Sequence, residues 1–299
     1  MDINWYPGHM AKTRRIILDT IKNVDIVIEL VDARIPTASK NPDIAELIGN
    51  KAKILILNKS DLADPVQNKK WAEYYRGLGY TVLLGNSRDK NDRKPVLNAI
   101  REAYREKAER DKKRGIVART ARVMILGIPN VGKSTFINNL CGARRAEAQD
   151  RPGVTQKKQW VPLAEGIDLL DTPGILWPKL ENQSDAALLA ITGAIKDTIL
   201  DLEGLSLILL AMLAKYYPEQ LKARYKLTEL EPKAYDLFLQ IGRKRGFAVS
   251  GGEVNEERTA ITLLDEFRGA KIGRITLERP EQKTEEGVAD VPNAEEIIE

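Results

Sequence analysis

The sequence predicts an α/β protein in which a doubly wound parallel sheet is followed by a smaller, mostly α-helical domain. Short apolar runs alternate with segments of helix length through the first 178 residues, which is the pattern of βαβ units. After residue 178 the apolar residues recur at helical spacing. The length of 299 residues suits two domains, at ~150 residues each. We therefore expect domains at residues 1–178 and 179–280, with an acidic, disordered tail at 281–299.

Four apolar runs rich in branched residues predict the strands of the sheet, because parallel strands covered on both faces are continuously apolar. These runs are Asp25–Val31, Lys53–Leu57, Tyr80–Leu84 and Arg122–Leu126. The segments predicted as crossover helices are Asn41–Ile48, Pro65–Gly77 and Lys94–Arg110. Residues 101–122 contain nine Lys and Arg against four acids, which favours a solvated helix and linker. Two further runs, Trp160–Leu163 and Ile167–Leu170, predict a hairpin.

Helical spacing of apolar residues predicts the second domain. Ser184 and Asp185 can cap a first helix. The apolar positions expected on that helix are Leu188, Ile191, Ile195 and Ile199. Further helices are predicted at Gly204–Tyr217, Pro232–Lys244 and Val254–Phe267. Strand-like alternation returns only at Lys271–Leu277.

Composition excludes several classes of protein. One cysteine, Cys141, excludes a disulfide framework, and one histidine, His9, excludes a multi-histidine metal site. Residues 281–299 carry one Lys and seven acids, a net charge of −6. Because the whole chain carries +4, residues 1–280 carry +10. A basic body favours a polyanionic partner, although solubility alone also explains it. The first ten residues lack an apolar stretch of signal-peptide length, and the longest apolar run, Gly204–Ala214, is too short to cross a bilayer. We expect a cytoplasmic protein that does not enter a membrane.

A phosphate-binding loop is predicted at Gly127–Ser134, which matches G-x-x-x-x-G-K-[ST] between a strand pattern and a helix pattern. Its glycines let backbone N–H groups converge on phosphate oxygens at a helix N-terminus. Lys133 would reach the β- and γ-phosphates, and the Ser134 hydroxyl would ligate Mg²⁺. The residues expected to contact the nucleotide are Asn130, Val131, Gly132, Lys133, Ser134 and Thr135. The alternative is an ordinary glycine-rich turn.

Two short motifs, taken together with the phosphate loop, indicate GTP binding. In Asn58-Lys59-Ser60-Asp61 (N-K-x-D), the carboxylate of Asp61 can accept both N1–H and N2–H of guanine. Adenine would leave that carboxylate unpaired, at a cost of several kcal/mol. Asn58 would tie this loop to the phosphate loop, and the stem of Lys59 would cover the base. A guanine-side loop is expected after the third strand, at Asn86-Ser87.

The second motif, Asp171-Thr172-Pro173-Gly174 (D-x-x-G), follows an apolar strand. Asp171 can hold the Mg²⁺ shell, and the N–H of Gly174 can face the γ-phosphate. Thr155, 21 residues after Ser134, is the expected switch threonine that meets Mg²⁺ and the γ-phosphate. The alternative for Thr155 is an exposed threonine in a β-turn.

The order of these motifs is unusual. Common GTPases run phosphate loop, D-x-x-G, N-K-x-D, whereas this chain runs N-K-S-D, phosphate loop, D-T-P-G. The sequence therefore resembles the circularly permuted GTPases over nearly its whole length. The resemblance also includes Trp5–Met10 and Val31–Pro36, but not the acidic tail. It implies a P-loop GTPase sheet in permuted order, with GTP or GDP and Mg²⁺ bound.

The resemblance also bears on catalysis. Ile175 stands where many GTPases place a water-orienting glutamine, and the missing group is worth roughly 10³–10⁵ in rate. In the family the histidine corresponding to His9 is regarded as catalytic, so His9, Lys133, Thr155 and Gly174 form the expected catalytic set. In related GTPases an asparagine at the position of Asn130 helps to bind K⁺. The alternatives are a surface histidine for His9 and simple turn chemistry for Asn130.

Basic residues late in the helical domain suit RNA phosphates. They are Arg243, Lys244, Arg245, Arg268, Lys271 and Arg274. A solvated basic face is the alternative. The resemblance implies a monomeric assembly factor that binds a late precursor of the large (50S) ribosomal subunit and its rRNA, with hydrolysis stimulated by the particle and driving release. Small-subunit maturation and a nucleotide-gated RNA scaffold stay open, while N-K-S-D disfavours a metabolic kinase.

Overall fold

The structure of the protein is a computed structural model. It describes residues 20–41, 48–49, 51–116, 119–142, 159–171, 182–249, 251–284 and 287–288. The chain divides into two compact units. The first contains the described residues up to 171 apart from Leu62–Gln67, and the second contains Leu62–Gln67 together with the described residues from 182 onward. The predicted domain boundary at residues 178 and 179 lies outside the described residues.

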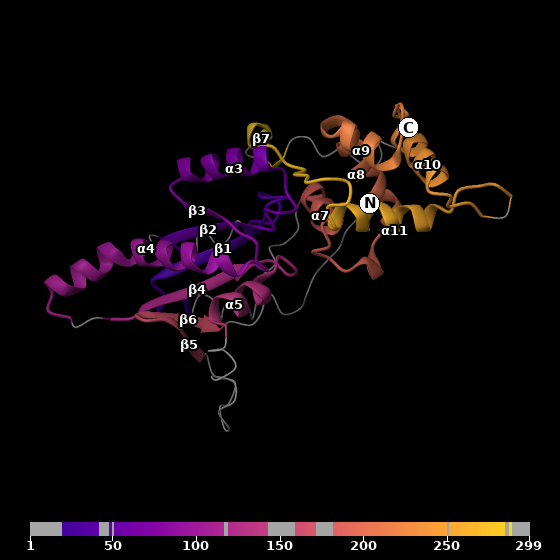
Figure 1. Cartoon of the computed structure of the whole chain (residues 1–299). Helices are drawn as coiled ribbons and strands as arrows, with labels where there is room; N and C mark the ends of the chain where they lie inside the picture. The colour runs from indigo at the N-terminus through magenta and orange to yellow at the C-terminus, as the bar shows by residue number, and fades with distance from the viewer. Residues whose placement is uncertain are drawn as a thin grey trace, which may run out of the picture. The chain divides into compact units, whose positions relative to one another are not determined.

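A six-stranded sheet forms the centre of the first unit. Its strands are β1 (Ile26–Asp32), β2 (Ala52–Asn58), β3 (Thr81–Leu84), β4 (Ala121–Gly127), β5 (Gln159–Ala164) and β6 (Ile167–Asp171). Their spatial order is β3-β2-β1-β4-β6-β5 (Figure 1). All neighbours are parallel except β5, which pairs antiparallel with β6. Each strand predicted for the sheet and the predicted hairpin are therefore confirmed, with ends that differ by one residue or less.

The register of the sheet aligns the loops that follow its strands. In the β1–β2 pair Asp32 lies opposite Asn58, and in the β1–β4 pair Leu30 lies opposite Gly127. The carboxyl ends of β1, β2 and β4 therefore lie along one edge, where ligands bind in open α/β sheets.

Helices α3 (Pro65–Gly77), α4 (Arg93–Lys113) and α5 (Lys133–Cys141) follow β2, β3 and β4. The predicted bounds of α3 match, whereas the predicted helix at 41–48 lies mostly outside the described residues. Only Val96, Leu97 and Ile100 of α4 are buried, and Figure 1 shows its second half extending past the sheet. The solvated helix expected within residues 101–122 is therefore confirmed as far as Lys113, where α4 ends.

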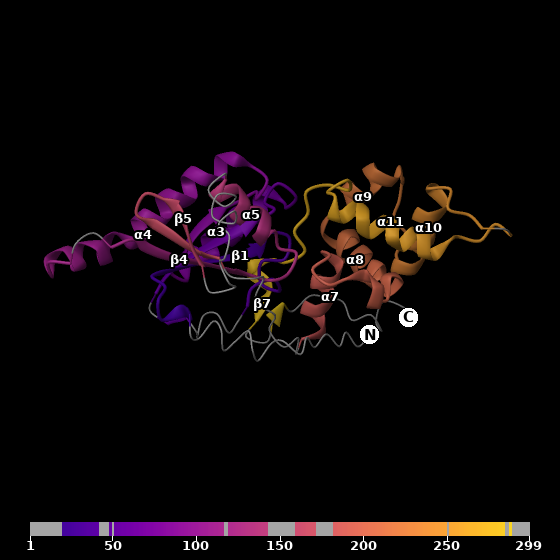
Figure 2. The same cartoon turned by 90° about the horizontal axis from the view of Figure 1, so that it is seen from below.

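The second unit is a helical bundle built around one apolar helix. Its helices are α7 (Gln183–Ile191), α8 (Leu202–Tyr216), α9 (Pro218–Tyr225), α10 (Ala234–Lys244) and α11 (Glu256–Arg268). Helix α8 contacts each of the other four, which is visible in Figure 2. Its buried face includes Leu205, Leu209 and Leu213, so the apolar run read from the sequence is a core helix. No helix within the described ranges is long and apolar enough to span a membrane.

Several predictions in the helical unit were wrong. The first helix ends at Ile191, because Gly193 adopts φ +79° and Ala194 donates back to the carbonyl of Leu189, so Ile195 and Ile199 lie beyond it. Its cap is Asn182, whose side chain accepts from the N–H of Ser184, rather than Ser184 or Asp185.

Two further differences have clear physical causes. Helix α9 was not predicted, and it begins at Pro218, since proline suits the first turn of a new helix. Residues 271–277 form no strand, because their partner is the loop at 62–64: Ile275 N–H donates to Leu62 and Thr276 Oγ1 accepts from Asp64 N–H. The expected disorder of 281–299 is wrong at β7 (Lys283–Thr284) and β8 (Gly287–Val288), which pair antiparallel.

Candidate nucleotide-binding site

The phosphate loop lies between β4 and α5, as the sequence predicts. Asn130 and Gly132 have positive φ angles of 57° and 99°, and α5 begins at Lys133, directly after Gly132. The N-terminal end of α5, with its partial positive charge, therefore meets the loop. Lys133 is buried, whereas Asn130, Ser134 and Thr135 are exposed. This arrangement offers backbone donors and hydroxyl groups to an anion.

Two glycines of this loop have no room for a side chain. A Cβ atom on Gly127 would lie 3.0 Å from the carbonyl oxygen of Leu30. A Cβ atom on Gly132 would lie 2.6 Å from Nδ2 of Asn58. The second contact is with the guanine-specific motif, so the two loops are packed against each other.

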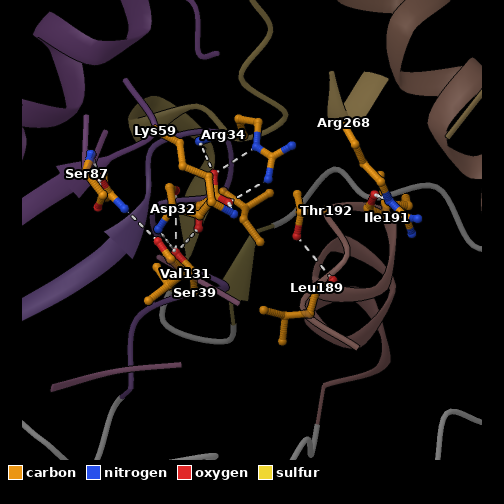
Figure 3. Close-up of polar contacts among 12 residues, drawn as sticks. Asp32, Arg34, Ser39, Lys59, Ser87, Val131, Leu189, Ile191, Thr192 and Arg268 are labelled. Atoms are coloured by element: carbon orange, nitrogen blue, oxygen red, sulfur yellow. Dashed lines mark hydrogen bonds and ion pairs between the residues drawn. The ribbon is translucent and has the colours of Figure 1, made fainter. Parts of the chain in front are cut away.

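Asn58 is the side chain that joins these loops. It is fully buried, its Nδ2 donates to the carbonyl oxygen of Val131 at 2.6 Å, and its Oδ1 accepts from Ser87 N (3.0 Å) and Ser87 Oγ (2.8 Å) (Figure 3). The link between Asn58 and the phosphate loop expected from the sequence is confirmed. The same residue brings in the loop at Asn86-Ser87.

The loop after β3 is held in place by α5 and α4. Asn139 of α5 donates to the carbonyl oxygens of Ser87 (3.2 Å) and Asp89 (2.6 Å). Arg93, at the start of α4, donates to the carbonyl oxygen of Leu140 at 2.8 Å. The N–H of Asn86 donates to Asp92, whose carboxyl pKa is raised chiefly by burial. The helix that starts at the phosphate loop therefore also fixes the guanine-side loop.

Lys59 and Asp61 complete the N-K-S-D loop at the same edge. Asp61 is exposed and accessible to a ligand. Lys59 has φ 58°, and its Nζ lies 3.0 Å from Oδ2 of Asp32 at the end of β1. Arg34 binds the same carboxylate through Nε (2.9 Å) and Nη2 (2.7 Å) (Figure 3). Burial opposes ionisation of Asp32, but these two cations hold its carboxyl pKa well below the usual range.

Four expected site residues are not fully described. His9, Thr155 and Gly174 lie outside the described residues. Asp171 ends β6, and β6 pairs with the phosphate-loop strand β4, with Leu170 opposite Met124. The backbone of Asp171 therefore lies at the expected edge, and its side chain is outside the description.

Sequence reasoning assigned no role to Asp32, Arg34, Arg93 or Asn139. Asp32 carried a usable signal, since it is a charged residue directly after a buried strand, as Asp171 is. Arg93 and Asn139 carried none, because their partners are backbone oxygens from distant segments.

The structure divides the basic residues expected to meet RNA. Arg245 pairs with buried Glu266, and Arg268 binds Asp197 through Nη1 (2.7 Å) and Nη2 (2.8 Å). Arg268 also donates to the carbonyl oxygens of Ala190 and Ile191 at the end of α7 (Figure 3). These two residues hold the bundle together and are poor candidates for RNA contacts. The exposed members of the predicted set are Arg243, Lys244, Lys271 and Arg274, of which Arg274 donates to the carbonyl oxygen of Ala63.

Comparison with known proteins agrees with this geometry. Residues 122–234 match the family model described as 50S ribosome-binding GTPase. The chain is 44% identical to ribosome biogenesis GTPase A of Bacillus cereus over 99% of this chain and 100% of the relative. It is 32% identical to the Thermotoga maritima protein of the same name, over 94% of this chain and 96% of the relative. Among solved structures, GNP-bound YlqF from T. maritima aligns with a TM-score of 0.62 at 30% identity, covering 90% of this chain and 99% of that one. GDP-bound YlqF aligns with a TM-score of 0.63 at 30% identity, covering 89% of this chain and 100% of that one.

Proposed function

The chain belongs to the ribosome biogenesis GTPase A family and is a GTP hydrolase, and from this premise we propose that it is an assembly factor for late maturation of the large ribosomal subunit. In its GTP-bound form it binds the immature particle, the particle stimulates hydrolysis, and hydrolysis releases the protein. The observation that carries the proposal is the link from Asn58 to Val131 and Ser87, which gathers three nucleotide loops at one sheet edge. The description of the matching family model, a ribosome-binding GTPase, supports the partner.

We assign the roles in nucleotide binding from this edge of the sheet. Lys133 contacts the β- and γ-phosphates, and the backbone N–H groups from Asn130 to Thr135 surround the phosphate oxygens. Asp61, exposed at the end of the N-K-S-D loop, accepts both guanine donors. Asn86 and Ser87 line the guanine side, where Asn58 and Asn139 hold their loop.

Ser134 is exposed at the N-terminus of α5, and Asp171 ends β6, the strand that pairs with the phosphate-loop strand β4. Hydroxyl and carboxylate oxygens are the ligands that Mg²⁺ prefers, so this donor set fits that ion, with Thr155 as a third ligand. When bound, Mg²⁺ neutralises charge on the phosphate oxygens. Gly174 donates its N–H to the γ-phosphate, and His9 and a K⁺ ion at Asn130 are the candidates for the missing catalytic group.

We also propose that the domain is circularly permuted. The N-K-S-D loop follows β2, and the phosphate loop follows β4, later in the chain. The two loops nevertheless meet through Asn58, because β1 lies between β2 and β4 in the sheet. Helix α4 and the residues after it connect the half of the sheet that ends at β3 to the half that begins at β4.

Hydrolysis is tested by measuring phosphate release from GTP with and without purified large ribosomal subunits. We expect slow release by the protein alone and a rise of at least tenfold with the particle. Lys133→Ala should abolish both, whereas Lys112→Ala, at an exposed position on the far half of α4, should change neither. Equal stimulation by small subunits would favour small-subunit maturation. Absence of particle-stimulated release would contradict the proposed cycle.

The partner is tested by sedimentation with ribosomal particles in GDP, a GTP analogue and no nucleotide. We expect co-sedimentation with large-subunit precursors in the GTP analogue only. Reversing Arg243 and Lys244 to Glu should weaken it, while Lys112→Glu with Lys113→Glu, equally exposed, should not. Binding that is independent of nucleotide would favour an RNA scaffold whose hydrolysis is incidental.

A further inference from the structure

The carboxylate of Asp32 lies between the strands that carry the two principal nucleotide loops. Strand β1 pairs with β2 on one side and with β4 on the other. Asp32 ends β1 and lies opposite Asn58, the first residue of N-K-S-D. A nucleotide with its base at Asp61 and its phosphates at Lys133 must therefore pass over the end of β1, where Asp32 is located.

Asp32 is fixed more rigidly than an ordinary loop carboxylate. It is 2% exposed, and Arg34 binds it through Nε at 2.9 Å, Nη2 at 2.7 Å and its backbone N–H at 3.0 Å. The backbone N–H of Asp32 in turn donates to Ser39 Oγ at 2.8 Å. Arg34 is itself buried, so the bidentate pair forms a stiff support.

Lys59 is the one other cation that the described structure places on this carboxylate. Its Nζ lies 3.0 Å from Oδ2 of Asp32, so its side chain runs from the end of β2 toward β1 and the phosphate-loop side (Figure 3). A free lysine side chain loses up to ~2 kcal/mol of rotamer freedom when it is fixed. A lysine that is already held loses less when a ligand binds against it.

We propose that Asp32, clamped by Arg34, is a positioning residue that sets the side chain of Lys59 in place before guanine-nucleotide binding. The ammonium is held at β1, which stretches the methylene stem across the sheet edge where the base and ribose rest. This inference rests on the proposed role of Lys59 in covering the base. Asp32 acts through Lys59 and does not itself touch the nucleotide.

The test compares two isosteric replacements of a carboxyl group by an amide on the same strand. Asp32→Asn weakens the hold on Lys59. Glu29→Gln makes the same replacement at another buried carboxyl group of β1, whose partners are Lys40 Nζ (3.7 Å) and the N–H of Asn41 (3.1 Å) and not Lys59. We expect Asp32→Asn to bind GDP about tenfold more weakly, as one charge-assisted contact is worth, and Glu29→Gln to bind it within about twofold of the wild type.

A second nucleotide separates positioning from general damage to the loop. Inosine diphosphate lacks the 2-amino group that Asp61 reads, so the ratio of GDP to inosine diphosphate affinity reports on Asp61. Since the Lys59 stem covers any purine, Asp32→Asn should weaken both nucleotides by the same factor and keep the ratio. A collapse of the ratio would mean that the whole loop is disordered, and the positioning role would be wrong.

A double-mutant cycle tests the route. In a Lys59→Met background, Asp32→Asn should have no further effect on GDP affinity, and a full additional tenfold loss would overturn the inference. If Asp32→Asn does not fold because Arg34 is left buried without its anion, Asp32→Asn/Arg34→Gln removes both charges and serves instead. Wild-type protein that fails to prefer GDP over ADP would sink the proposed function. If the wild type prefers GDP over ADP but Asp32→Asn and Glu29→Gln bind GDP with equal affinity, the inference alone would be wrong.

Discussion

Asn58 and Val131 are 73 residues apart, yet Nδ2 of Asn58 donates to the carbonyl oxygen of Val131 at 2.6 Å in a fully buried contact. The Oδ1 atom of the same side chain accepts from both the N–H and the hydroxyl of Ser87. One amide therefore uses its donor on the phosphate loop and its acceptor on the guanine-side loop. The geometry of the site depends on which strands are neighbours and not on their order in the chain.

Replacement of Asn58 should affect stability and nucleotide binding together. Asn58→Ala leaves the carbonyl of Val131 and both donors of Ser87 without this partner, and we expect about 2–4 kcal/mol less free energy of unfolding and at least tenfold weaker GDP binding. Asn58→Asp keeps the acceptor but places a second oxygen against the carbonyl of Val131, so it should bind GDP no better than Asn58→Ala. Ser87→Ala loses only the hydroxyl contact and should have the smallest effect. Urea unfolding and GDP titration measure both quantities, and the reverse ranking would contradict the bridging role.

The two glycines that flank α5 provide a matched pair. Gly132 (φ 99°) precedes the helix and Gly142 (φ 53°) follows it. A Cβ atom at Gly132 would lie 2.6 Å from Asn58 Nδ2, whereas one at Gly142 would meet nothing within 4 Å. Alanine is strained at both positions, at about 1–3 kcal/mol each, and Gly142, with φ 53° and ψ −137°, is the less tolerant of the two backbone conformations. We expect Gly142→Ala to cost only that stability, and Gly132→Ala also to abolish GDP binding, measured by calorimetry. Equal GDP affinities in the two variants would show that the clash is relieved without moving Asn58.

The strands and the link from Asn58 to the phosphate loop could be predicted from the sequence because each depends on local patterns. An apolar run predicts a buried strand, and polar residues after parallel strands meet at one edge. The end of α7 and the loop-like course of 271–277 could not be predicted, since they depend on Gly193 and on a hydrogen-bonding partner 213 residues away, from Leu62 to Ile275. The internal ion pairs of Arg245 and Arg268 were missed for a similar reason. A basic side chain looks the same in sequence whether it meets solvent, RNA or an internal carboxylate such as Glu266.

Asp61 should determine which purine is bound. Its carboxylate can accept from N1–H and from the 2-amino group of guanine. Xanthine carries an oxygen at that second position, so Asp61→Asn, which supplies an amide donor, should lose GTP affinity by at least 100-fold, or about 3 kcal/mol, and gain affinity for xanthosine triphosphate. Competition binding with the two triphosphates measures the change. Asp64→Asn, three residues along the chain, is the control, because its carboxylate caps α3 at the N–H of Val66 and accepts from Tyr217. A preference for GTP retained in Asp61→Asn would remove Asp61 from base recognition.

The helical unit should lose stability in acid through Glu266. Burial opposes ionisation of this carboxyl group, but hydrogen bonds from Arg224, Tyr225 and Arg245 outweigh burial, so its pKa lies below the usual value. A carboxyl group whose pKa is lower in the folded than in the unfolded state stabilises the fold above the unfolded pKa of about 4.5, and this contribution is lost as the pH falls through the folded value. At pH 7 the amides of α11 should therefore exchange faster in Glu266→Gln than in the wild type. The opening free energy of α11 should be lower by about 2–4 kcal/mol.

Hydrogen exchange of α11 peptides measures this difference between pH 7 and pH 3. The difference in opening free energy between the wild type and Glu266→Gln should become smaller as the pH falls, because Glu266 of the wild type then becomes protonated and loses its charge. Glu257→Gln, exposed on the same helix, should follow the wild type throughout. A gap that stays constant with pH would mean that Glu266 contributes by packing and not by its charge. Since Arg224 and Arg245 both donate to Glu266, removing either arginine should also reduce the pH dependence, and Arg245→Gln provides that second check.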